Sequence, residues 1–171
     1  MIREVEPERC TYGPTTRCTG RPSSRFRSRH QVRPAKSHAN ILEQKPEVIH
    51  MAPKCTAWCM WSTAKGDQKC QEDRQRDLPI VRFCAQVALH QLKHGRNFII
   101  ENPKDSAIWR VHCFQQLLQQ ESVTWGNLNF CAYGMRDPVF KDYYSKATSL
   151  LHNLPDGVLD PVFKPCPALD I

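Results

Sequence analysis

The chain has 171 residues, of which 40% are hydrophobic and 24% are charged, and these fractions are those of a folded globular domain. They exclude a wholly disordered chain. Because no apolar run approaches the roughly 20 residues of a membrane-spanning helix, we expect no membrane protein. The formal net charge is +7, but it is uneven, since residues 1–40 carry nine Lys and Arg against three Glu. The rest of the chain, with 15 basic and 14 acidic side chains, is nearly neutral.

Residues 1–40 form a basic, proline-rich head without a helical or alternating apolar pattern. Such a composition predicts a segment that is disordered on its own. No apolar region follows Met1, so we do not expect a secretory signal. The head has two interpretations, a solvated tail without function or an arm that contacts nucleic-acid phosphates. The candidate phosphate contacts are Arg25, Arg27, Arg29 and Arg33.

The nine cysteines are irregularly spaced and odd in number. Without a secretory signal, this usage predicts thiols in a reducing intracellular compartment, a class that includes the nucleus. Cys55, Cys59 and Cys70 resemble the start of a zinc site, but no further Cys or His pair completes a tetrahedral set, so we predict no metal. Cys84 and Cys113 lie in apolar helical patterns and are expected in the core.

Residues 41–171 read as alternating strands and helices. The predicted strands span residues 48–51, 97–100, 128–132 and 147–151, and the predicted helices span residues 77–92 and 105–118. The first helix is expected to begin at Asp77, with Pro79 in its first turn, after a loop over residues 54–73. This order predicts an α/β domain with a partial doubly wound, Rossmann-like, mostly parallel sheet and flanking helices.

In a parallel sheet, ligands bind outside the carboxyl ends of the strands. This rule selects the segment 53–59 after the first strand and the segment 101–103 after the second. The first carries Cys55 and the second carries Glu101. A thiol allows covalent chemistry, and a carboxyl group can transfer a proton, so we expect the two to converge on one substrate. The alternatives are an ordinary loop thiol and a solvated carboxylate.

Three features in this order resemble the core of cytosine-5 DNA methyltransferases. The first is a strand that ends in Pro53, Lys54 and Cys55, with the aromatic residue Trp58 three positions after the cysteine. The second is a helix of about four turns. The third is a strand that ends in Glu-Asn-Pro at 101–103. The segments 131–134 and 146–153 are similar to divergent methyltransferase-like segments of phages and of retroelement polyproteins. The resemblance covers residues 46–166 and implies an origin in a mobile element.

The resemblance implies a mechanism. Cys55 would attack carbon 6 of a flipped cytosine, and Glu101 would protonate or hydrogen-bond nitrogen 3, so that carbon 5 becomes nucleophilic toward the methyl group of S-adenosylmethionine. Asn102 would hold its loop by backbone hydrogen bonds. The residues implied to support the two loops are Pro53, Lys54, Trp58, Asn102 and Pro103.

The Gly-rich cofactor loop that the family carries upstream of its Pro-Cys strand has no counterpart here, since the head has only Gly13 and Gly20. The sequence therefore predicts a fragment or degenerate copy of the enzyme. It would use S-adenosylmethionine only if a complementing chain or a larger polyprotein supplies that segment. The alternative is a nucleic-acid-binding remnant, or a retroelement polyprotein segment, without activity. Trp58, Trp61 and Trp125 are expected to pack at the sheet rim rather than stack on bases.

Overall fold

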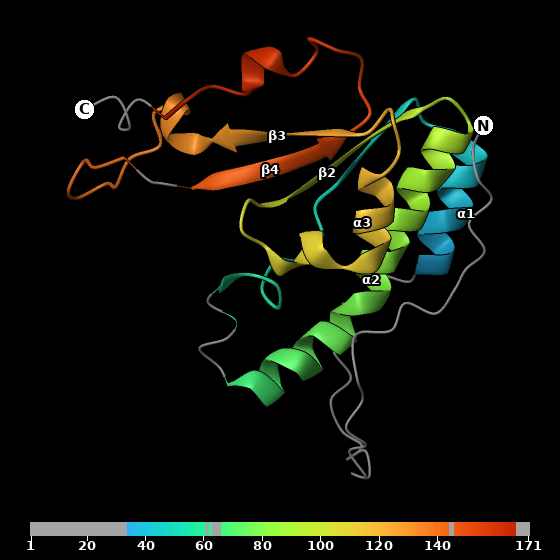
Figure 1. Ribbon diagram of the computed structural model, residues 1–171, viewed down its shortest axis with the longest axis horizontal. Coiled ribbons are helices and arrows are strands. Elements are labelled where there is room, and N and C mark those ends of the chain that lie inside the picture. Colours follow the sequence, from blue (N-terminus) through green and yellow to red (C-terminus); the bar gives the residue numbers. More distant parts are fainter. Residues whose placement is uncertain (1–33, 61, 63–65, 144–145, 167–171) are drawn as a thin grey trace. The chain divides into compact units, whose positions relative to one another are not determined.

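The computed structural model describes residues 34–60, 62, 66–143 and 146–166 (Figure 1). The chain divides into two compact units, Met1–Lys45 and Pro46–Ile171. In the first unit, the helix α1 spans Pro34–Gln44. It begins inside the head, for which no regular element was expected. The second unit holds the sheet and the other helices.

The sheet has four strands in the order β1-β2-β4-β3, namely β1 Val48–Met51, β2 Asn97–Pro103, β3 Thr124–Asn129 and β4 Ala147–His152. The α/β class is confirmed, but the prediction of a mostly parallel sheet is wrong. Only β1 and β2 are parallel, whereas β4 runs antiparallel to both β2 and β3. The physical reason is the connection from β3 to β4, which contains no crossover helix and so returns the chain in the opposite direction.

The helix α2, Asp67–Lys93, has 27 residues and begins ten residues before the predicted start. Its first turns lack an apolar face, which is why the sequence pattern missed them. They carry ion pairs at helical spacing instead, since Lys69 lies near Glu72 and Asp73, and Arg76 lies 2.9 Å from Asp73. Pairs three or four residues apart stabilise a helix. Pro79 therefore lies inside the helix rather than in its first turn.

The predicted helix at 105–118 is divided into the 3₁₀ helix η2, Ala107–Arg110, and the helix α3, His112–Leu118. Ser106, and not Asp105, caps η2, because its Oγ accepts a hydrogen bond from the Ile108 N–H at 3.3 Å. The strand β3 begins at Thr124 instead of residue 128, and Phe130–Tyr133 form the 3₁₀ helix η3.

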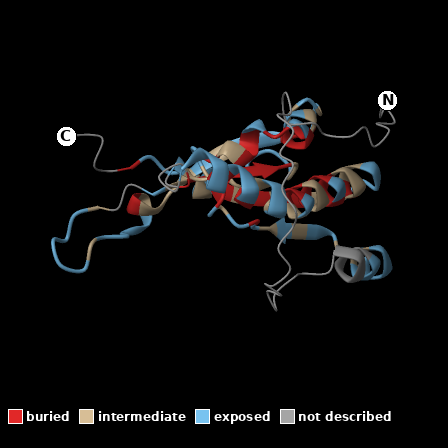
Figure 2. Cartoon of the chain, turned by 90° about the horizontal axis from the view of Figure 1, so that it is seen from below, coloured by how far each residue is buried: buried red, intermediate tan, exposed pale blue. Residues whose placement is uncertain are grey.

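The core lies between one face of the sheet and the helices α2 and α3 (Figures 1 and 2). Its fully buried side chains include Phe98, Ile100, Leu151, Val87, Ala88, Phe114 and Leu117. Cys84 and Cys113 are buried between the helices, as predicted. Burial, together with the nearby Cys113, raises the pKa of the Cys84 thiol to about 12, so this thiol is a packing residue rather than a nucleophile.

The opposite face of β3 and β4 is covered by the segment that follows β4, which we call the strap, residues 153–166. The Phe163 ring lies so close to Gly126 that a Cβ there would be 2.3 Å from it. Cys131 and Cys166 form a disulfide that ties the strap to η3, so the expectation that all the cysteines are thiols is wrong for this pair. Within the described part of the chain, no helix has the length and apolar character to cross a membrane.

Candidate functional site

The carboxyl ends of β1 and β2 lie side by side, because the two strands are parallel neighbours. The loop after β1 and the loop after β2 therefore leave the same edge of the sheet. A side chain joins them: Asn102, which is 2% exposed, donates from Nδ2 to the Pro53 carbonyl oxygen at 2.8 Å. The hydrogen bond is buried, and it connects the two segments that carry the candidate thiol and carboxylate.

Residues 55–59, which we call the thiol turn, fold into a compact turn. The Cys55 carbonyl accepts hydrogen bonds from the backbone N–H groups of Trp58 and Cys59, both at 2.8 Å. Trp58 is 1% exposed, and its carbonyl accepts the Ala107 N–H at 2.7 Å. The thiol turn is thus fastened to the loop that follows β2. Because Trp58 is buried, it packs and is not available to stack on a base.

Two residues that the sequence interpretation missed also hold this arrangement. Arg74 of α2 donates from Nε to the Ala57 carbonyl at 3.0 Å, and its guanidinium lies 5.8 Å from the centre of the Trp58 ring. Trp109 donates from Nε1 to the Pro103 carbonyl at 2.9 Å. Arg74 lies in the part of α2 without an apolar pattern, so its role had no signal in the sequence.

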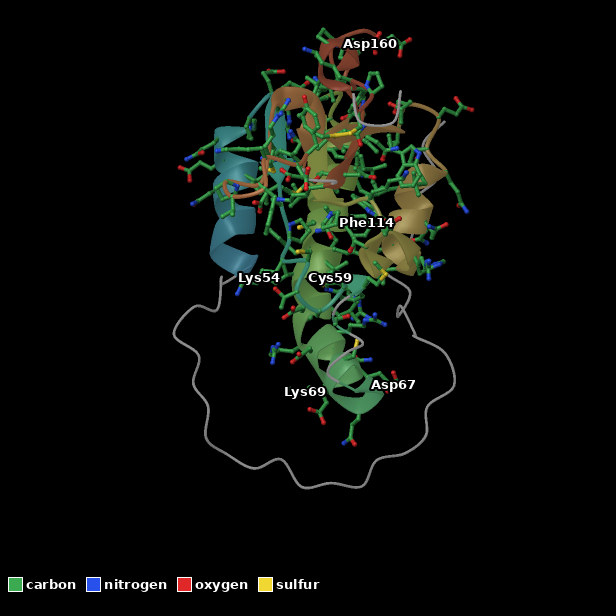
Figure 3. All side chains as sticks on the ribbon, turned by 90° about the vertical axis from the view of Figure 1, so that its left-hand side faces the viewer. Lys54, Cys59, Asp67, Lys69, Phe114 and Asp160 are labelled. Carbon is green, nitrogen blue, oxygen red and sulfur yellow. A yellow bond between two sulfur atoms is a disulfide. The ribbon has the colours of Figure 1, made fainter. Side chains whose placement is uncertain are left out.

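The Cys55 side chain is half-buried and is a free thiol. The neighbouring Lys54 is exposed, and Figure 3 shows Lys54 and Cys59 in the same loop. Cys59 is also half-buried, with its Sγ 3.8 Å from the Thr56 carbonyl. The turn therefore presents a partly accessible thiol on a backbone that buried groups hold in place, which suits a nucleophile.

Glu101 lies within β2, one residue before Asn102, so the two side chains point to opposite faces of the sheet. Its carboxylate lies 3.4 Å from Nε2 of His50 on β1, and the two side chains are 35% and 54% exposed. Among the described residues, no hydrogen bond joins Glu101 to Cys55. The two groups share an edge of the sheet, and His50 is a neighbour of Glu101 that the sequence interpretation missed.

Two buried polar atoms at this edge have no hydrogen-bond partner among the described residues, Asn102 Oδ1 and Trp58 Nε1. A buried polar atom without a partner costs about 1–3 kcal/mol. One atom belongs to each strand-end segment. Such groups are rare in folded proteins and call for an explanation when they occur.

Other candidate residues are placed differently. Arg25, Arg27, Arg29 and Arg33 lie outside the described residues, as does Trp61. Trp125 is 51% exposed, and its ring contacts Trp109 edge-on. In the described ranges, no group of three or more His, Cys, Asp or Glu side chains is arranged to hold a metal ion.

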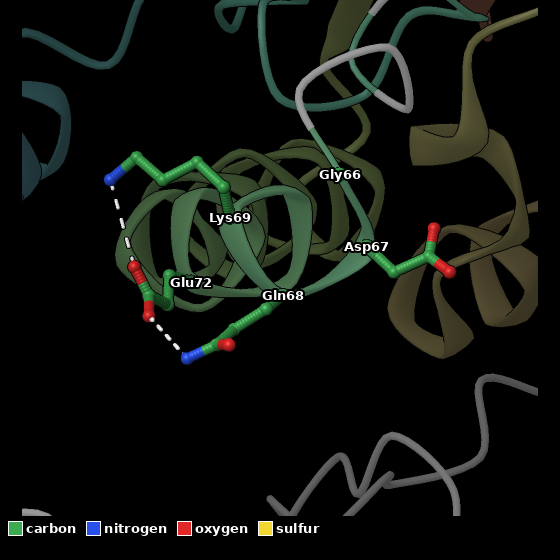
Figure 4. Close-up of a pocket in the computed structure, with 5 residues that line it drawn as sticks. All are labelled: Gly66, Asp67, Gln68, Lys69 and Glu72. Atoms are coloured by element: carbon green, nitrogen blue, oxygen red, sulfur yellow. Dashed lines mark hydrogen bonds and ion pairs between the residues drawn. The ribbon is translucent and has the colours of Figure 1, made fainter.

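One pocket among the described residues can be compared with what S-adenosylmethionine needs. The pocket at the start of α2 (Figure 4) is lined by Gly66, Asp67, Gln68, Lys69 and Glu72. All five residues are exposed, and none has an apolar side chain, whereas an adenine ring needs apolar walls. The strand β1 is an edge of the described sheet, and the turn that follows it carries a thiol rather than glycines. We therefore derive no step through this cofactor.

Comparison with known protein families, with curated proteins and with solved structures finds no match to this chain.

Proposed function

We propose that residues 46–166 are the catalytic half of a cytosine-5 DNA methyltransferase-like domain, as a fragment or degenerate copy derived from a mobile element. The proposal depends chiefly on the buried hydrogen bond from Asn102 to Pro53. It fastens the Pro-Lys-Cys turn after β1 to the Glu-Asn-Pro end of β2. The motifs that carry the resemblance thus meet at neighbouring strand ends.

In the proposed chemistry, the Cys55 thiolate forms a bond from sulfur to carbon 6 of a cytosine. The electron pair of the double bond between carbons 5 and 6 moves toward carbon 5, and Glu101 donates a proton or hydrogen bond at nitrogen 3. S-adenosylmethionine supplies a methyl group for carbon 5 in such enzymes. Another chain, or the rest of a larger polyprotein, would have to hold it. Without it, carbon 5 takes a proton from water. The proposed location is intracellular, with the nucleus as the compartment that holds the DNA.

The addition step is tested without a methyl donor. DNA in which the target cytosine is replaced by 2-pyrimidinone traps a thiolate at carbon 6, and denaturing electrophoresis and intact mass detect the adduct. We expect an adduct with the full chain, none with Cys55→Ser, and an undiminished yield with the matched control Cys59→Ser. An adduct that persists in Cys55→Ser assigns the wrong nucleophile.

Glu101 is tested by the rate of the same reaction. A general acid contributes about 10²- to 10⁴-fold, so Glu101→Gln should slow adduct formation by about 100-fold or more. Glu121→Gln, an exposed carboxylate after α3, serves as the control and should leave the rate unchanged. An equal rate in Glu101→Gln and in the unmodified chain would remove the carboxylate from the mechanism.

The alternative, a binding remnant without chemistry, gives a different result. The chain would then form no adduct yet would bind DNA, with a steep salt dependence that disappears when residues 1–40 are deleted.

A further inference from the structure

A third segment leaves the same edge of the sheet as the thiol turn. In the pairing of β2 with β4, Pro103 at the end of β2 is opposite Thr148, and Asn129 at the end of β3 is opposite Ala147 at the start of β4. The Lys104 N–H also donates to the Ala147 carbonyl at 3.1 Å. The connection from β3 to β4 therefore emerges beside the end of β2, and it extends beyond the sheet (Figure 1).

Cations lie over aromatic rings on this connection and the adjoining strap. Three pairs are formed: Arg136 over Tyr143 at 4.0 Å from the ring centre, Lys146 over Phe130 at 4.8 Å, and Lys164 over Tyr133 at 5.1 Å. Arg136 also donates a hydrogen bond to the Tyr143 hydroxyl. A cation held over a ring is attracted by the ring's quadrupole, so each pair fixes one positive charge beside an aromatic surface.

The connection also presents two large apolar side chains to solvent. Val139 is 74% exposed and Phe140 is 77% exposed. Oδ1 of Asp137 accepts the backbone N–H groups of both residues, at 2.8 and 2.7 Å, which shapes the turn that carries them. Exposed apolar groups rimmed by polar residues mark interaction sites. We call Phe140 and the three cation–ring pairs together the basic–aromatic tip.

We infer that the basic–aromatic tip binds single-stranded DNA. A single strand offers the two chemistries that the tip can recognise, because its phosphates attract the three cations and its unpaired bases stack on aromatic rings. Within a duplex the base faces are covered by their neighbours, so exposed rings have little to contact. A purely apolar partner would gain nothing from the cations.

The tip lies at the edge of the sheet that carries the thiol turn. A strand held there passes the edge of the sheet that carries the thiol turn. An unpaired cytosine costs less to place in a reactive site than one that must be flipped out of a duplex. In this respect the inference rests on the proposed function, and it names single-stranded DNA as the substrate class.

The experiment measures the dissociation constant of the full chain for fluorescent (dT)20 by anisotropy. This probe contains no cytosine, so its binding is independent of the thiol chemistry. The triple variant Arg136→Gln, Lys146→Gln and Lys164→Gln should weaken binding at least about tenfold. It should also reduce the slope of log Kd against log salt by about 2, for three lost phosphate contacts. Phe140→Ser should weaken binding at least about fivefold through lost stacking.

The matched control removes three exposed charges on α2, as Lys69→Gln, Arg76→Gln and Lys93→Gln. Binding that falls equally in the tip and control variants reflects net charge only and overturns the inference. Equal affinity for a 20-base-pair duplex, or unchanged binding in Phe140→Ser, also overturns it. Phe140 is exposed, so this variant retains the fold if the triple variant does not. Phosphatidylserine vesicles test the other occupant: if Phe140→Ser loses vesicle binding but keeps (dT)20 binding, the tip is a membrane contact.

Discussion

The thiol turn and the basic–aromatic tip leave the same edge of one sheet, yet they are built in opposite ways. Trp58 and Asn102, which hold the turn, are almost fully buried and are hydrogen-bonded to backbone from other elements. The tip places its Phe140 ring and its cations at the surface. A buried scaffold fixes a reactive group in position, whereas an exposed surface is free to contact a large ligand. Under the proposed function, the buried turn is the site for chemistry and the exposed tip is the site that holds a strand.

The largest expected contrast comes from removing one aromatic side chain in each region. Trp58→Ala should lower the free energy of unfolding by about 3–5 kcal/mol, because it empties a fully buried volume and frees the Arg74 guanidinium. Phe140→Ala should change it by less than about 0.5 kcal/mol, because the ring is exposed. Urea unfolding of both variants measures the two values. Equal losses would show that the two regions are not built differently.

A second substitution, Gly126→Ala, should disturb the base of the tip and leave the thiol turn unchanged. Gly126→Ala drives a Cβ into the Phe163 ring, displaces the strap, and should cost about 1–3 kcal/mol. Lys164, the next residue in the strap, would move away from Tyr133, so (dT)20 binding should weaken while alkylation of Cys55 keeps its rate. Gly126→Ala combined with Phe163→Ala should recover part of the stability. A Cys55 alkylation rate that rises with Gly126→Ala would instead couple the two regions.

The polar scaffold of the turn is the subject of a third prediction. Asn102→Ala leaves the buried Pro53 carbonyl without its hydrogen-bond donor, and it should lower the free energy of unfolding by about 1–2 kcal/mol. This value lies in the lower part of the usual range, because the Asn102 Oδ1 that the substitution removes already lacks a partner among the described residues. Asn129→Ala removes an exposed hydrogen bond to the Lys164 carbonyl and should cost about 0.5 kcal/mol. Thermal unfolding of the pair tests this order, and the reverse order would contradict a buried scaffold under the thiol turn.

The smallest effect is a pH dependence on the strap side of the sheet. Burial lowers the pKa of His152 below its usual value of 6.5. The unfolded chain therefore binds a proton at a higher pH than the folded chain, so the contribution of His152 to stability falls as the pH drops below about 6.5. Protonation would also remove the Nδ1 acceptor of the Leu154 N–H. The free energy of unfolding should change less steeply with pH in His152→Gln than in the unmodified chain. An unchanged slope would show that other groups cause the pH dependence.

The parts of the fold that the sequence predicted are those with a local pattern. The strand β1 matches the predicted bounds, because the apolar Val48, Ile49 and Met51 lie between Pro46 and Pro53. The first turns of α2 depend on ion pairs and have no such pattern. The position of β4 between β2 and β3 depends on contacts between distant segments, which no local window contains.

The candidate site was predictable to the same degree. The rule for strand ends placed Cys55 and the Glu-Asn-Pro segment after two neighbouring strands. The parallel pairing of β1 with β2 makes these strands neighbours, but Glu101, Asn102 and Pro103 lie within β2 and not after it. The face of Glu101 was missed because β2 was expected to end at residue 100. The strand extends through Pro103, so alternation turns Glu101 away from Asn102 and toward His50. Arg74 had no signal, because it reaches Ala57 from a distant part of the chain.

We propose that the thiol turn carries a nucleophile for cytosine-type bases. The most direct test digests the covalent product of the full chain with 2-pyrimidinone DNA and locates the modified residue by tandem mass spectrometry. We expect modification at Cys55, with Cys59 in the same turn unmodified. Modification at any other cysteine, or no covalent product while (dT)20 binding remains intact, would contradict it.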